Sequence, residues 1–259
     1  MPTILGTLLL VLATFLVSTL VLFYIAHRYL SFFKFENNGY PAIFSFAIGT
    51  TFGLTLAFIC VSTWQNYNHI DSVVSKEATT LTTIYRTLDA FKPEFRDPSA
   101  TLLTEYAKKV ITQEWPLMSK GQFDHDAYND FHQFQIRLLH HIPLNNAEMA
   151  AQQEELRLTS EYYALRLERI TSAKSALDRS MILTLGLGAF IFILYQCLHA
   201  MPGMRQHLVM ISLLSISISL IFFLILSYNT PFSGPNAISP EALSKALELW
   251  QIDSAMPLR

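Results

Sequence analysis

Charge is what this chain has least of. Asp, Glu, Lys and Arg make up 15% of its 259 residues, against roughly 25% in soluble domains. The shortage is local, because residues 65–180 hold 13 of the 18 Lys and Arg and 16 of the 20 Asp and Glu. This distribution predicts a membrane protein with one polar insert. A net charge of −2 also excludes the basic field that nucleic-acid binding requires.

Reactive and metal-binding patterns are scarce as well. The two cysteines, Cys60 and Cys197, lie in apolar runs without metal or redox spacing and are expected to be small buried hydrophobes. Residues 124–132 hold Asp and His side chains, but calcium-loop and zinc spacings are missing, so helix capping and a solvated face are favoured. The sequence contains no GxSxG, Walker, HExxH or GxGxxG motif. We expect no catalytic residue, no metal and no cofactor.

Long uncharged runs are what the chain does contain. Four of them can cross a ~30 Å hydrocarbon layer, namely residues 2–26, 41–64, 181–201 and 207–228. The first is expected to stay uncleaved, because no Lys or Arg precedes it as in a secretory signal. A basic and aromatic border suited to the membrane interface follows it, at His27, Arg28, Tyr29 and Lys34. Turns are expected at residues 37–41 and 201–205.

The polar insert shows helical periodicity. From Trp64 to Leu88 apolar residues recur every three or four positions, which predicts an amphipathic helix continuous with the second run. Lys92-Pro93 is expected to end this helix. A second helix is predicted to start with Asp97 as N-cap and Pro98 in the first turn, and to end at Trp115-Pro116.

Two further helices follow in the insert, and a short one comes after the last span. The first is predicted from Asp124 to His141, and its expected buried residues are Tyr128, Phe131, Leu138 and Leu139. The next opens with the capping box Asn145–Glu148 and meets no breaker before Gly186, so it is expected to run directly into the third span. In the tail, Ser239-Pro240-Glu241 starts an amphipathic helix with Leu243, Leu247 and Trp250 on one side.

These elements predict an all-α integral membrane protein with four transmembrane helices and a helical-bundle insert between spans two and three. The expected domains are residues 1–64 with spans one and two, 65–180 as the polar helical domain, 181–229 with spans three and four, and 230–259 as a loop and short amphipathic helix. Four spans place the insert and both termini on one side. Positive charge in the short loops leans slightly toward a periplasmic insert but does not decide the orientation.

The central stretch resembles the bestrophin-like family of small membrane proteins, a family of unknown function. The matching residues are Trp64 to Asn68, Glu77-Ala78, Leu81, Tyr85-Arg86, Tyr106, Val110-Ile111, Glu114-Trp115-Pro116, Arg166, Arg169, Pro231-Phe232-Ser233-Gly234 and Ile238-Ser239-Pro240. The order EA…YR…EWP and the tail PFxG…ISP are its most specific pieces. The resemblance covers roughly residues 50 to 243 and implies distant kinship with bestrophins, which are homo-pentameric anion channels with a cytosolic helical domain.

This kinship implies a homo-oligomeric channel for small anions in a bacterial-type inner membrane, with a cytoplasmic helical domain and the second span lining the pore. On a helical wheel one stripe of that span holds Phe44, Ile48, Thr51, Thr55, Phe58 and Ser62. Such residues form hydroxyl contacts between apolar constrictions that gate by dewetting. The alternative is an ordinary packed span whose Thr and Ser bond to their own backbone. No Asp, Glu, Lys or Arg lies within a span, which argues against proton-coupled pumps and transporters.

Charged residues of the insert give a second set of candidates. Glu77, Arg86, Glu114 and Trp115 are interpreted as structural or inter-subunit polar contacts. A solvated charged face is equally compatible with Glu77, Arg86 and Glu114, and is favoured for Glu105.

A membrane sensor or scaffold is the alternative function. A four-helix bundle between two spans also describes many extracytoplasmic ligand-binding domains. Such receptors need an output module, and only about 30 residues follow the fourth span.

Overall fold

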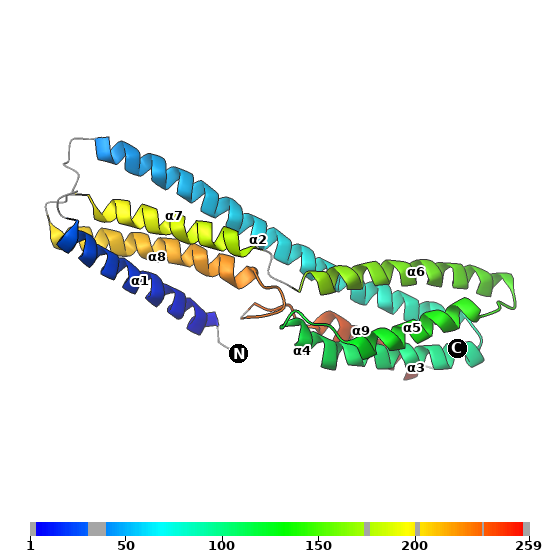
Figure 1. Ribbon diagram of the computed structural model, residues 1–259. Coiled ribbons are helices and arrows are strands. Elements are labelled where there is room, and N and C mark those ends of the chain that lie inside the picture. The colour runs from blue at the N-terminus through cyan, green and yellow to red at the C-terminus, as the bar shows by residue number, and fades with distance from the viewer. Residues whose placement is uncertain (1–3, 31–39, 174–176, 200–202, 235, 256–259) are drawn as a thin grey trace. The chain divides into compact units, whose positions relative to one another are not determined.

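The computed structural model describes residues 4–30, 40–173, 177–199, 203–234 and 236–255, and the described residues form helices joined by short connections (Figure 1). In chain order the helices are α1 (Ile4–Tyr29), α2 (Tyr40–Thr87), α3 (Pro93–Lys109), α4 (Trp115–Met118), α5 (His125–His140), α6 (Asn146–Thr171), α7 (Arg179–Cys197), α8 (Met204–Tyr228) and α9 (Glu241–Ala255). A 3₁₀ turn (Leu88–Ala90) follows α2, and a π-helical turn (Val110–Glu114) joins α3 to α4. Lys34, residues 37–39 of the first predicted turn and residues 201–202 of the second lie outside the described residues.

The chain divides into two compact units. One, here called the membrane unit, comprises residues 1–67, 175–230 and 234–236. The other, the helical domain, comprises residues 68–174, 231–233 and 237–259. The domain therefore combines the insert with tail segments that follow the fourth span.

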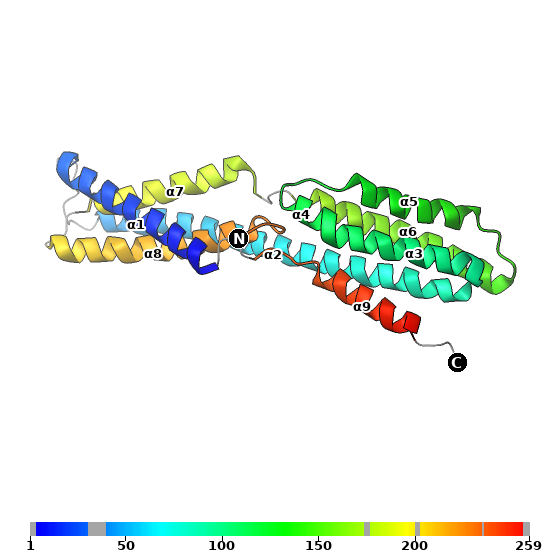
Figure 2. The same ribbon diagram turned by 90° about the horizontal axis from the view of Figure 1, so that it is seen from below.

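Among the described helices, α1, α2, α7 and α8 are long and apolar enough to cross a membrane. The predicted all-α membrane fold is confirmed. Inside the membrane unit α1 lies along α8 (Figures 1 and 2). Thr19 Oγ1 of α1 donates a hydrogen bond to Ser215 Oγ of α8 at 2.9 Å, and both residues are buried. Small residues and hydroxyls thus let these two helices approach closely.

Two aromatic rings fit against glycines where α2 meets α7. The rings of Phe52 and Phe192 lie 5.9 Å apart. A Cβ built on Gly188 would lie 2.9 Å from the Phe52 ring, and one on Gly49 would lie 3.0 Å from the Phe192 ring. Gly53, four residues after Gly49, has nothing within 4 Å of its Cβ position. Each glycine contacting a ring leaves room for a side chain of the other helix.

In the helical domain α3 packs against α5 and α9, α5 packs against α6, and the second half of α2 contacts α6 and α9 (Figure 2). As predicted, the periodic residues from Ile70 to Leu88 face inward on a helix continuous with the second span. The tail helix α9 buries Leu243 and Trp250. The Trp250 ring stacks on Tyr85 of α2, with centroids 4.4 Å apart and planes within 3° of parallel.

A local capping signal defines the start of α6. Asn145 Oδ1 accepts from the Glu148 N–H, and Glu148 Oε2 accepts from the Leu144 N–H, both at 2.8 Å. The predicted capping box is therefore confirmed, with the return bond reaching one residue further back than in the usual motif.

On α5 the prediction for the inner face was partly wrong. Tyr128 and Leu139 are exposed, and the buried positions are Ala127, Phe131, Phe134 and Leu138.

The predicted start of the second insert helix was also wrong, because α3 begins at Pro93 rather than after Asp97. Lys92 has the extended conformation that a residue before proline prefers, and Pro93 then occupies the first helical position. Pro98 lies inside α3 and supplies no N–H to the Glu94 carbonyl. Arg137 Nη2 donates to that carbonyl instead, at 2.8 Å, so a side chain from α5 replaces the lost backbone donor.

Trp115-Pro116 does not end the helix, contrary to the prediction. The backbone widens to a π-helical turn in which the Trp115 N–H bonds to the Val110 carbonyl, and α4 continues to Met118. Pro116 falls at the start of α4, where the π turn has already interrupted the regular i→i−4 bonding.

The expected continuous helix from the insert into span three is absent. The last turn of α6 closes with bonds from Ser172 N–H to Glu168 and from Ala173 N–H to Ile170. In the membrane unit, the buried Leu177 gives its N–H to Asn229 Oδ1 at 2.8 Å, so this N–H takes no part in a helix. A new helix, α7, begins at Arg179.

Candidate functional site

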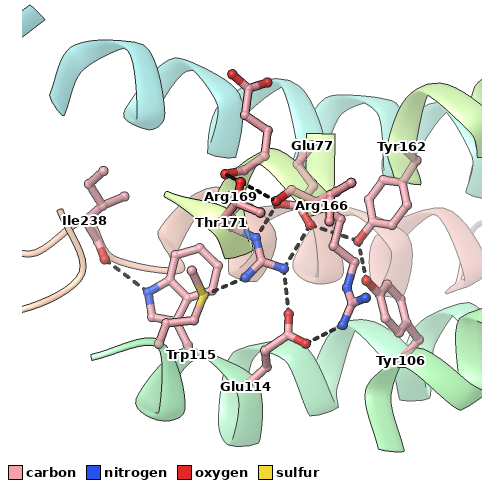
Figure 3. A network of polar contacts seen from close by, with 12 residues as sticks. Glu77, Tyr106, Glu114, Trp115, Tyr162, Arg166, Arg169, Thr171 and Ile238 are labelled. Atoms are coloured by element: carbon pink, nitrogen blue, oxygen red, sulfur yellow. Dashed lines mark hydrogen bonds and ion pairs between the residues drawn. The ribbon is translucent and has the colours of Figure 1, made fainter. Parts of the chain in front are cut away.

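Four charged side chains from three segments meet in the interior of the helical domain (Figure 3). Glu77 comes from α2, Glu114 from the π-helical turn, and Arg166 and Arg169 from α6. Glu77, Glu114 and Arg169 are completely buried, and Arg166 is 4% exposed. Two carboxylates balance two guanidinium groups, so we call this set the Glu–Arg cluster.

Arg169 is the centre of the cluster. Its Nε donates to Glu77 Oε2 at 2.6 Å and its Nη2 donates to Glu77 Oε1 at 3.0 Å. The same Nη2 donates to Glu114 Oε1 at 2.7 Å, and Nη1 reaches Met118 Sδ at 2.7 Å. The planar fork of a guanidinium suits such two-point carboxylate binding, which a lysine cannot reproduce.

The remaining carboxylate oxygens also have donors. Arg166 Nη2 donates to Glu114 Oε2, and the Tyr162 hydroxyl donates to Glu77 Oε1 at 3.1 Å. The hydroxyls of Tyr106 and Tyr162 lie 2.7 Å apart. Every carboxylate oxygen of the cluster thus has at least one partner, which a buried charge requires.

Trp115 connects the cluster to the tail. Its indole Nε1–H donates to the Ile238 carbonyl at 3.0 Å, and its ring meets the Phe232 ring edge-on at 5.6 Å. The Arg169 guanidinium carbon lies 5.0 Å from the centroid of the same indole, within the range of a cation–π contact. The π-helical turn has a direct role here, because it buries the consecutive residues Glu114 and Trp115 together.

The cluster keeps its arginines charged and its phenols neutral. Burial by itself would lower the pKa of Arg169, but the carboxylates of Glu77 and Glu114 more than offset this, so the pKa is raised. Burial raises the pKa of Tyr106 and of Tyr162, because a phenolate in the interior is costly. These groups neither gain nor lose protons near neutral pH, and the arrangement holds segments together rather than transferring protons.

The stripe on the second span lies on the outside of a single chain. Phe44 is 61% exposed and Phe58 is 73% exposed, and Thr51, Thr55 and Ser62 are exposed as well. The hydroxyls of Thr51 and Thr55 donate to the carbonyls of Ala47 and Thr51, at 3.0 and 2.9 Å. One edge of the stripe borders a groove of about 610 Å³ between α2 and α7, whose lining includes Ile48, Thr51, Thr55, Thr184 and Gly188.

The other predicted contact residue, Arg86, lies outside the Glu–Arg cluster. It is exposed and borders a groove between α2 and α9, together with Thr79, Thr83 and Lys245. No group of three His, Cys, Asp or Glu residues that could hold a metal ion occurs within the described ranges. Asp124 caps α5, and Asp130 pairs with Lys109 at 2.5 Å.

Sequence reasoning gave Arg166 and Arg169 no role beyond a family signature, and it missed Tyr162. A signal for this face was present in α6, where Glu148, Glu155, Tyr162 and Arg169 follow one another at intervals of seven. All four are buried. Polar residues at every seventh position of a helix share one side of it.

In a comparison with known families, a model described as the bestrophin-like domain matches residues 8–243. The chain belongs to the bestrophin-like family. This match includes the whole Glu–Arg cluster, the second-span stripe and the tail segment that contacts Trp115. Searches of curated proteins and of solved structures gave no match for this bestrophin-like chain.

Proposed function

We propose that this bestrophin-like protein is a homo-oligomeric ion channel for small anions, with α2 lining the pore. The observation that carries the proposal is the charge-free second-span stripe. On it Thr51 and Thr55 lie between Phe44 and Phe58, Ser62 follows Phe58, and all five are exposed in a single chain. Copies arranged around an axis would turn each position into a ring of like side chains. Rings of aromatic residues close a pore by dewetting, and rings of hydroxyls offer polar contacts between them.

Membership of the bestrophin-like family supports the number and placement of the copies. Bestrophin kinship suggests a pentamer in a bacterial-type inner membrane, with the helical domain in the cytoplasm. A conducted anion needs hydrogen-bond donors, and the hydroxyls of Thr51 and Thr55 donate to their own helix. In this proposal they rotate away from those carbonyls as an anion passes.

The Glu–Arg cluster has a supporting role in the proposal. Arg169 stays charged near neutral pH, and the cluster contains no reactive pair of nucleophile and base. Its function is to hold α2, α6 and the tail in one arrangement, so that the helix that lines the pore has a fixed continuation outside the membrane. We assign it no catalytic residue.

Reconstitution of the purified full-length protein tests the proposal. We expect flux of small anions into liposomes above that of protein-free liposomes, with a smaller flux of potassium. Electron microscopy of the same sample should show a ring of copies with Thr51 and Thr55 facing the axis. A monomer or dimer with these threonines packed between helices, and no flux at several pH values, would overturn it. Labelling of a cysteine introduced in the insert from the periplasmic side would instead favour the sensor or scaffold.

A further inference from the structure

One carboxyl group in the interior of the helical domain has no partner. Glu155 of α6 is completely buried, and neither Oε1 nor Oε2 has a hydrogen-bond partner among the described residues. Ser99 of α3 is also completely buried, and its Oγ likewise lacks a partner. An unpaired buried carboxylate costs several kcal/mol or more, so such a group normally takes up a proton.

The register of α3 against α6 brings these two orphan groups to one layer. Three contacts show that the segment from α3 through the π-helical turn to α4 runs in the same direction as α6: Tyr106 bonds to Tyr162, Glu114 to Arg166 and Met118 to Arg169. Ser99 precedes Tyr106 by seven residues, and Glu155 precedes Tyr162 by seven. Two turns of helix, about 10.5 Å, therefore separate Ser99 from Tyr106 and Glu155 from Tyr162. The hydroxyls of these two tyrosines lie 2.7 Å apart.

Apolar side chains occupy this layer from the other helices. Glu77 of α2 bonds to both Arg169 and Tyr162, and seven residues beyond it along α2 is Ile84, which is completely buried. On α5, Phe131 packs on Tyr162 with centroids 4.7 Å apart, and the following inward residues Phe134 and Leu138 are completely buried. Ser99 belongs to the same layer, but its Oγ forms no hydrogen bond with Glu155.

The titratable groups nearest along each packed element bond to other residues or are exposed, and the buried Nε of Arg137 has no hydrogen-bond partner among the described residues. On α2, Glu77 is bound by Arg169, and on α3 and α6 Tyr106 and Tyr162 bond to each other. On α5, Arg137 donates to the Glu94 carbonyl. After α5, His141 pairs with Glu148 of α6 at 3.5 Å. Asp89 in the 3₁₀ turn and Glu154 beside Glu155 are exposed to water.

We propose that Glu155 is a buried proton-binding site, in which the folded domain holds this carboxyl group in its neutral form. The inference does not depend on the proposed channel activity. Its consequence is that Glu155 must release a proton whenever the helical domain unfolds, or opens around Glu155, at a pH above the ordinary pKa of a carboxyl group.

The electrostatics agree with the geometry. Burial raises the pKa of Glu155 from 4.5 to about 8, and the neighbouring Glu154 carboxylate adds to the rise. A carboxyl with a raised folded-state pKa gives its full stabilisation below the unfolded value and loses it as pH rises through the folded value. The window is therefore pH 4.5 to about 8. Within it the unfolding equilibrium constant should increase about tenfold per pH unit, because unfolding releases one proton.

Infrared difference spectroscopy of the full-length protein gives the direct test. The spectrum of the unchanged protein minus that of Glu155→Gln at pH 7 should contain the carbonyl stretch of a protonated carboxyl, and this band should disappear above pH 8. Ser99→Ala should leave the band in place, because the Ser99 hydroxyl forms no hydrogen bond with Glu155. Glu161→Gln serves as the matched control on α6, since Glu161 is exposed and paired with Arg157. No protonated carboxyl at pH 7, or one that titrates near 4.5, would overturn the proposal.

Unfolding in detergent provides an independent readout. Below about pH 5 the unchanged protein and Glu155→Gln should have similar melting temperatures. Between pH 5 and 8 the unchanged protein should lose stability relative to the variant, and the difference should level off above pH 8. A difference that stays constant across this range would mean that Glu155 does not take up a proton on folding, and the site would be rejected.

Discussion

Arg169 and Glu77 lie 92 residues apart in the chain and share two hydrogen bonds inside the helical domain, at 2.6 and 3.0 Å. One residue belongs to the helix that continues the second span and the other lies near the end of α6. Removing either charge leaves the other in an interior that water does not reach, with only Glu114 and Arg166 to rebalance it. This single pair therefore makes the domain sensitive to substitution at two distant points of the sequence.

Replacing Glu77 with Gln should destabilise the protein by about 3–5 kcal/mol, because it leaves an uncompensated buried guanidinium charge. Thermal or denaturant unfolding of the full-length protein in detergent measures the effect. The matched control is Glu105→Gln, since Glu105 is exposed and should change stability by less than about 0.5 kcal/mol. Equal losses in the two variants would show that the burial of Glu77 has no energetic consequence.

Replacing Trp115 with Phe removes the donor to the Ile238 carbonyl while keeping a ring beside Arg169. A lost hydrogen bond of this kind costs about 1 kcal/mol, which corresponds to a roughly fivefold larger population of detached tail. Trypsin cleavage after the exposed Lys245 should accelerate by a similar factor. Trp64→Phe is the control, because Trp64 is half exposed. Unchanged cleavage in Trp115→Phe would rule out this bond as the attachment of the tail.

Two glycines on α7 should respond differently to replacement by alanine. A Cβ on Gly188 would meet the Phe52 ring at 2.9 Å, whereas one on Gly186 has nothing within 4 Å. Gly186→Ala should gain up to about 1 kcal/mol from helix propensity. In Gly188→Ala the crowding of the ring, about 1–3 kcal/mol, should cancel or outweigh that gain. Melting temperatures of the two variants in detergent measure the difference, and a larger gain for Gly188→Ala would contradict the packing of α7 against α2.

The proposed pore makes a prediction about two phenylalanines of equal exposure. Phe58 lies on the stripe and is 73% exposed, while Phe46 lies on the far side of the same helix and is 75% exposed. Phe58→Ala should raise anion flux in liposomes several-fold, because it removes an apolar constriction. Phe46→Ala should leave flux within about twofold of the unchanged protein, since this residue faces away from the proposed axis. Equal effects of the two substitutions would exclude the stripe as the pore wall.

The predictable part of this fold depends on local patterns. Uncharged runs located the four spanning helices, and apolar spacing from Ile70 onward predicted the long continuation of α2. Asn145 and Glu148 predicted the start of α6, because both partners of that cap lie within three residues of each other. Patterns of this kind need no knowledge of the tertiary structure.

The errors arose where a distant residue decides the outcome. Pro98 looked like a helix start, but Arg137 of α5 replaces the donor that it lacks. Pro116 looked like a helix end, but a π-helical turn carries the chain past it. The break before α7 accompanies a bond from Leu177 to Asn229, 52 residues later. None of these partners can be identified from the neighbouring sequence.

For the same reason, only part of the Glu–Arg cluster could be predicted from the sequence. Sequence reasoning singled out Glu77 and Glu114 but left burial and solvation equally open. Burial follows from Arg166 and Arg169, which supply compensating charges from α6. The sequence does not single out Glu155, because a carboxylate in a charged helix is usually solvated. Its complete burial is visible only in the folded domain.

The bond from Trp115 to Ile238 also constrains the order in which the protein can be made. Ile238 follows Trp115 by 123 residues, and synthesis at about 5–20 residues per second delivers it roughly 6–25 s later. In that interval α7 and α8 must leave the ribosome and enter the membrane. Until then the Trp115 indole N–H lacks its carbonyl, and Leu243 and Trp250 do not yet exist to cover their side of the domain. The helical domain is thus complete only after the last span has been synthesised. A chain cut short before the tail exposes to quality control the surface that Leu243 and Trp250 would cover.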